Sequence, residues 1–227
     1  MRTKALLKGD IGFQFKYGFY FLYLVFSVLY IGILFALPFE WREKAALLMV
    51  LTDPAAMGLY FMGAIILLEK SEKVLNSIAI SPVKSREYVL SKLLSISIIS
   101  TAVGLAIGIA GGVVSNLLYF SIGVFLASCL FSAVGLIIAA NVSTLNAFII
   151  ATIPASLLIN VPAIAYLFGF KKNWLILHPG VSMIELCSSG QNAIFAFLVL
   201  VFWTVLLAAL SSRVVGKMLQ AVGGVKL

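Results

Sequence analysis

Long apolar segments separated by short polar ones set the pattern of this chain. Each is about as long as the 20 or so residues that a helix needs to cross a bilayer, and none alternates as the strands of a membrane barrel do. The segments cover residues 17–37, 45 or 54 to 68, 88–115, 117–140, 145–168 and 193–210. The pattern predicts an all-α polytopic membrane protein with six transmembrane helices, in a single transmembrane domain over residues 1–227.

The composition agrees with a bilayer as the solvent. Hydrophobic residues make up 63% of the 227 and charged residues 11%, against about 45–50% and 25% in ordinary soluble chains. The first apolar segment lacks a convincing cleavage site, so it is interpreted as an uncleaved first span rather than a secretory signal. Cys129 lies in an apolar segment and Cys187 in a loop, which predicts two free thiols.

Lysine and arginine residues predict the orientation. If the N-terminus is cytoplasmic, twelve of the sixteen basic residues lie on the cytoplasmic side, as the positive-inside rule favours. The four others are Arg42, Lys44, Lys171 and Lys172. Both termini are then cytoplasmic, as an even number of spans requires. The formal net charge of +8 therefore indicates membrane topology and contact with anionic membrane lipid, and no nucleic-acid partner.

A polar island interrupts the apolar pattern between the second and third spans. Residues 67–94 hold eight of the twenty-four charged side chains. Within them Val74, Leu75 and Ile78 form one narrow apolar face of a short helix, and Ser81-Pro82 ends that helix. A loop that only anchors the chain through its positive charge is one interpretation. The amphipathic pattern also fits a short helix that docks a soluble partner.

The order of motifs in the island resembles the membrane subunits of ABC-2 type exporters. That family typically has a Glu-rich end of the second span, a short coupling helix, a Ser/Thr-Pro turn and a next helix ending in a Lys-Leu-Leu-like motif. The matching positions here are Glu69, Glu72, Leu75, Ser81, Pro82, Val83, Glu87, Tyr88, Lys92 and Leu93. This chain departs from the frequent Gly-Thr-Leu-Glu of the family, because Lys73-Val74-Leu75-Asn76 stands in its place. The six-span order extends the resemblance over nearly the whole chain.

The resemblance implies a permease subunit of an ATP-driven exporter in the cell membrane of a prokaryote. Two permease subunits, identical or different, would form the pathway, and separate ATP-binding subunits would dock on the coupling-helix loop, residues 69–88. ATP and Mg²⁺ would be bound by those partners, since this chain has no phosphate-binding loop and its one Gly-Lys pair, Gly216-Lys217, is followed by Met218. The residues expected at the interface with the ATP-binding subunit are Glu69, Glu72, Val74, Leu75, Ile78, Pro82, Arg86 and Glu87.

The two ends of the pattern carry further expectations. Leu7, Ile11 and Phe15 repeat every four residues within 1–16, which suits an amphipathic helix on the inner leaflet; a disordered basic tail is the alternative, and the resemblance implies an elbow helix. Residues 169–192 form the long outer loop. Its apolar pieces, 174–177 and 181–186, predict short helices, and the resemblance implies a re-entrant cap.

The chain carries no residue set for catalysis or for a metal site. The spans contain no His-Glu-x-x-His or Gly-x-Ser-x-Gly motif, which argues against an intramembrane enzyme. His178 and Glu185 are too few to form a metal site, and the sequence identifies neither a role for His178 nor a substrate. An ion-coupled secondary transporter or a channel subunit without an ATPase is the remaining alternative, with Asp53 as its one candidate charge in the bilayer.

Asp53 distinguishes these two classes of transporter. Followed by Pro54, it fits the N-cap of the next helix near the outer surface. We therefore expect Asp53→Asn to leave substrate export by membrane vesicles largely intact. Loss of export at normal expression would instead favour an ion-coupled transporter.

Overall fold

A computed structural model describes residues 2–52 and 56–222. Within these ranges the structure is helical and contains no strand, so the all-α prediction is confirmed. Asp53 and Pro54 lie outside the described residues. The elements are α1 Arg2–Lys16, α2 Phe19–Ala36, α3 Phe39–Val50, α4 Ala56–Ser71, α5 Val74–Ala79, α6 Ser85–Ala110, α7 Leu117–Asn141, α8 Leu145–Leu167, η2 Asn173–Leu177, α9 Pro179–Cys187 and α10 Ala193–Val222.

Among the described residues, five helices are long and apolar enough to cross a membrane, namely α2, α6, α7, α8 and α10. The remaining expected span, which is the second along the chain, corresponds to α4. This helix has 16 residues and is therefore about 24 Å long. The apolar segment that precedes it is not part of the same helix, because α3 ends at Val50. The chain is thus a polytopic membrane protein, and of the two predicted starts of the second span, near residue 45 and near residue 54, the bounds of α4 fit the later one. A full count of six spans and their orientation stay predictions.

Helix α4 is short but lies at the centre of the bundle, where it packs mainly on α7 and also on α6 and α8. Its side chains Leu59, Met62, Ile65 and Ile66 are almost fully buried. By contrast, α2, α8 and α10 expose many large apolar side chains. Exposed apolar surface of this extent is expected where a helix faces lipid or another membrane subunit.

Small residues allow the central helices to approach closely. A methyl group added at Gly135 of α7 would lie 2.9 Å from the Cα of Leu59 in α4, and one added at Gly104 of α6 would lie 2.8 Å from a Val124 methyl of α7. Gly104 and Gly135 therefore serve packing within the chain, as small residues commonly do between membrane helices.

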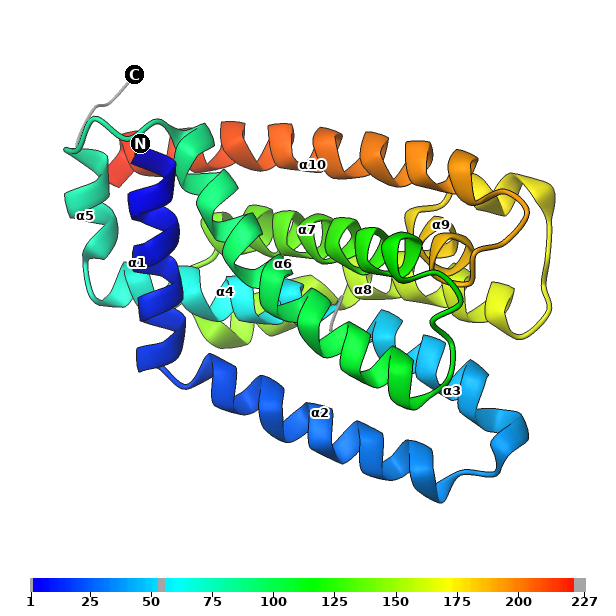
Figure 1. Ribbon diagram of the computed structural model, residues 1–227. Helices are drawn as coiled ribbons and strands as arrows, with labels where there is room; N and C mark the ends of the chain where they lie inside the picture. Colours follow the sequence, from blue (N-terminus) through cyan, green and yellow to red (C-terminus); the bar gives the residue numbers. More distant parts are fainter. Residues whose placement is uncertain (1, 53–55, 223–227) are drawn as a thin grey trace.

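The helices α1 and α5 lie at one end of the bundle, across the direction of the long helices (Figure 1). The start of α1 and the last turns of α10 are at this same end. Short helices also form in the long loop near the opposite end, where α9 packs on α7, α8 and α10. The predicted N-terminal helix and the predicted short helices of the 169–192 loop are therefore both present.

The contact between α4 and α7 predicts a matched pair of glycine variants. Gly135→Ala forces the new methyl group against the α4 backbone, so we expect it to destabilise the fold by about 1–3 kcal/mol. Gly32→Ala in α2 meets no atom within 4 Å and should be neutral or stabilising by up to about 1 kcal/mol. Thermal unfolding in detergent measures both. Equal midpoints for the two variants would contradict this packing.

Candidate functional site

A buried ionic cluster connects three helices at the end where α1 and α5 lie. The Lys92 ammonium of α6 lies 2.6 Å from the Asp10 carboxylate of α1 and also forms an ion pair with Glu69 of α4. Lys92 is only 1% exposed and Glu69 4%. An ammonium so enclosed needs compensating charge and hydrogen bonds to be tolerated, and both carboxylates supply them.

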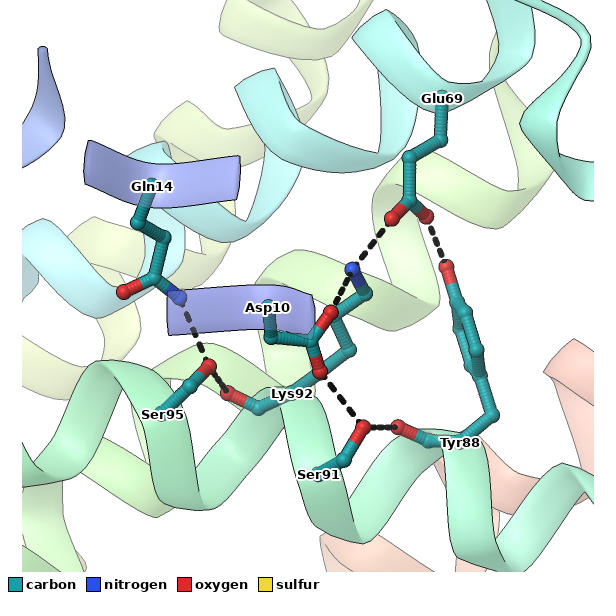
Figure 2. A network of polar contacts seen from close by, with 7 residues as sticks. All are labelled: Asp10, Gln14, Glu69, Tyr88, Ser91, Lys92 and Ser95. Atoms are coloured by element: carbon teal, nitrogen blue, oxygen red, sulfur yellow. Dashed lines mark hydrogen bonds and ion pairs between the residues drawn. The ribbon is translucent and has the colours of Figure 1, made fainter. Parts of the chain in front are cut away.

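Neighbouring polar side chains complete the hydrogen bonding of this cluster, as Figure 2 shows. The Tyr88 hydroxyl donates to the second oxygen of Glu69, and the Ser91 hydroxyl donates to the second oxygen of Asp10 at 2.6 Å. One helical turn further on, the Gln14 amide donates to the Ser95 hydroxyl at 2.7 Å. The α1 helix is therefore attached to α6 at two positions four residues apart, through Asp10 to Ser91 and Lys92 and through Gln14 to Ser95.

The polar face that makes these contacts was not predicted from the sequence. The sequence pattern drew attention to Leu7, Ile11 and Phe15, but Ile11 is 38% and Phe15 75% exposed, which leaves them free to face lipid. Asp10 and Gln14, on an adjacent face of α1, are buried. Their spacing of four residues, together with Ser91 and Ser95 in an otherwise apolar helix, is the signal that could have revealed the contact.

The last turn of α4 and the residue that follows the helix also contact two further parts of the bundle. The Lys70 ammonium donates to the carbonyl oxygens of Ala139, Ala140 and Val142 at 2.7, 3.1 and 2.6 Å, where the C-terminal end of α7 has unpaired carbonyls and a partial negative charge. The Tyr17 hydroxyl, between α1 and α2, donates to Glu72. Glu69, Lys70 and Glu72 thus contact three other parts of the bundle, namely α6, the end of α7 and the connection between α1 and α2.

Helix α5 begins immediately after this turn. Lys73 has φ 59° and ψ 20°, a left-handed conformation that non-glycine residues adopt rarely, and it turns the chain sharply from α4 into α5. The short helix itself is that predicted from the amphipathic pattern, with bounds 74–79. It packs on α4 and α10.

The structure divides the residues expected at the partner interface into two groups. Leu75 is 1% exposed and belongs to the core of the chain, and Glu69 belongs to the ionic cluster. Glu87 accepts a hydrogen bond from the Lys84 backbone N–H at 2.9 Å and so caps α6. Glu72, Pro82 and Arg86 are exposed, and Val74 and Ile78 are half-buried.

Leu75, expected on a partner-facing apolar surface, is instead turned toward its own chain by α5, so a contact of this side chain with a partner stays a prediction. The amphipathic pattern did not identify Ile80 as an exposed apolar residue. Ile80 directly follows α5 and is 85% exposed. A cavity of about 290 Å³ lies beside it, lined among others by Ile78, Val83 and Leu219. Ile80 and this cavity thus form an exposed apolar surface beside α5.

At the opposite end, His178 and Glu185 have separate partners. His178 Nε2 lies 3.0 Å from the Leu158 carbonyl oxygen, and burial lowers the pKa of this histidine. The Glu185 carboxylate accepts a hydrogen bond from Tyr166. Cys129 and Cys187 are both buried free thiols, as predicted.

The ionic cluster predicts a large effect of removing its single cation. Lys92→Met leaves Asp10 and Glu69 facing each other without a countercharge, so we expect a loss of about 3–5 kcal/mol in unfolding free energy. Adding Asp10→Asn and Glu69→Gln removes the uncompensated charge and should recover most of that loss. Thermal unfolding in detergent measures both variants, and a single variant as stable as the parent would contradict the ion pairs.

Comparison with known proteins agrees with a membrane transport subunit. Residues 1–223 match the model of the fluoroquinolones export permease protein family. Two relatives, both called fluoroquinolones export permease protein and both from strains of Mycobacterium tuberculosis, are each 25% identical over 167 residues. The aligned part is 73% of this chain and 70% of each relative. The match is consistent with the expected ABC-2 type permease. Because it covers almost the whole chain, this protein belongs to the fluoroquinolones export permease protein family.

Proposed function

We propose that this permease is the membrane subunit of an ABC-2 type exporter and that separate ATP-binding subunits dock around α5. The observation that carries the proposal is the position of α5. It follows directly on the end of α4, where Glu69, Lys70 and Glu72 contact α6, the end of α7 and the connection between α1 and α2. A displacement of α5 by a docked subunit would therefore act on several membrane helices at once.

The proposed movement is a rigid-body one. Because Glu69 and Lys70 join α4 to α6 and α7, these helices are expected to tilt together rather than slide independently. Such switching between two packings is a common way of converting a local event into a global change. ATP and Mg²⁺ would be bound by the partner subunits, and two permease chains, identical or different, would form the pathway.

The proposed docking surface is centred on Ile80. Exposed polar residues of the same loop include Glu72, Lys73 and Arg86. An apolar centre with a charged rim is the usual composition of a protein interface. The cavity beside Ile80 would receive an apolar side chain of the ATP-binding subunit.

Fluoroquinolones are the substrate class that we propose to test first, because the family description and both relatives carry that name. An ion-coupled transporter is the second candidate, since Lys92, Asp10 and Glu69 are ionisable groups buried within the helix bundle. Norfloxacin uptake by inside-out vesicles, energised either by ATP or by an imposed ion gradient, distinguishes the two. Uptake with the gradient alone would refute the ABC proposal.

Docking predicts a specific loss for one surface variant. Ile80→Asp places a charge in the apolar centre of the proposed interface, so we expect at least a tenfold drop in the ATP-binding subunit recovered with tagged permease from native membranes. Quantitative mass spectrometry after mild detergent extraction measures the recovery. Unfolding in detergent should be unchanged.

Two control variants accompany this measurement. Ser115→Asp adds the same charge at an exposed position in the turn between α6 and α7 and should leave recovery unchanged. Leu75→Asp buries a charge in the core and should reduce the amount of folded permease itself. If Ile80→Asp recovers as much ATP-binding subunit as the parent does, the proposed surface is wrong.

A further inference from the structure

A second cavity lies at the end of the bundle opposite α5, between the end of α8, η2 and the start of α10. Its volume is about 370 Å³. Two lysines, Lys171 and Lys172, and two amide side chains, Asn173 and Asn192, line it. The remaining lining residues are Tyr166, Ile176 and Phe195. A cavity with several polar hydrogen-bond donors beside apolar walls is suited to a ligand that has both a polar and an apolar part.

The lining carries positive charge without a compensating carboxylate. Neither lysine forms an ion pair among the residues that the structure describes. An adjoining cavity of about 210 Å³ shares Tyr166 and Lys171 but contains Glu43 and Glu185, so the two cavities differ in charge. The first turn of α10 adds backbone N–H groups and the partial positive charge of a helix N-terminus. Together these features favour an anion, and lysine is a common partner of phosphate groups.

The apolar surroundings favour a lipid over a free anion. Three large exposed apolar side chains, Phe170, Trp174 and Leu177, are adjacent in sequence to the lining residues Lys171, Asn173 and Ile176, as is usual where a membrane protein meets the interface of the bilayer. From the cavity, an exposed apolar stripe follows α10 at helical spacing. It consists of Ile194, Leu198, Phe202 and Val205, which are 72%, 58%, 61% and 61% exposed.

The length of this stripe matches one leaflet. Eleven residues separate Ile194 from Val205, which corresponds to about 16 Å along a helix. Half of the hydrocarbon thickness of a bilayer is about 15 Å. A phosphate held in the cavity would therefore leave two acyl chains in contact with the stripe over the depth of a single leaflet.

We propose that this cavity binds the phosphate group of an anionic phospholipid, with Lys171 and Lys172 as its charged partners and the stripe on α10 as the contact for its acyl chains. The site is independent of α5 and of the proposed ATP-binding partner. Its failure would leave the transport proposal untouched, and the reverse is also true.

Native mass spectrometry of the full-length permease in detergent, titrated with phosphatidylglycerol, tests this site. Each lysine near an anionic phosphate is expected to account for about a fivefold change in affinity. We therefore expect Lys172→Gln to raise the apparent Kd about fivefold and Lys171→Gln with Lys172→Gln to raise it further. Lys44→Gln is the matched control, because Lys44 is exposed and lines only the adjoining, carboxylate-containing cavity.

Three outcomes would overturn the proposal. One is unchanged phosphatidylglycerol affinity in the Lys171→Gln and Lys172→Gln double variant, and another is an equal loss in Lys44→Gln. The third is displacement of the lipid by inorganic phosphate at millimolar concentration, which would assign the cavity to a soluble anion. Tighter binding of phosphatidylglycerol than of phosphatidylcholine, abolished in the double variant, supports the lipid site.

Discussion

The buried Lys92 ammonium is the constraint on which this end of the protein depends. A charge removed from water costs several kcal/mol unless carboxylates and hydrogen bonds replace the lost hydration. Here the two carboxylates come from α1 and α4, so the position of each helix is tied to a group on α6. Helix α5 starts five residues after Glu69. The orientation of α5 is therefore a consequence of how one charge is compensated.

Apolar length predicted most of this fold from the sequence. Five expected spans exist as helices of sufficient length, and α1 and α5 formed where amphipathic spacing predicted them. The start of the second span was left open between residues 45 and 54, and the structure divides the apolar segment between α3 and α4. Apolarity alone does not fix where one helix ends and the next begins, because both pieces are equally soluble in the bilayer.

The candidate site was less predictable, because periodicity shows which face of a helix is apolar but not what covers it. Leu75 has the pattern expected of a docking residue, and it is covered by the chain itself. Lys92 fits the positive-inside pattern, which predicts a charge at the cytoplasmic surface. That pattern contains no information about buried carboxylate partners. Asp10 and Lys92 are 82 residues apart. Such a pairing follows from tertiary packing, which no local rule contains.

The order of residues along the chain gives the ionic cluster a consequence for biosynthesis. A lysine two turns inside a long apolar helix is unfavourable to insert alone, by about 2.5–3.5 kcal/mol near the bilayer centre and less toward its edge. Both compensating carboxylates, Asp10 and Glu69, precede Lys92 in the sequence. During translation they leave the ribosome first. Both carboxylates are therefore available to form ion pairs when the Lys92 ammonium is inserted into the membrane.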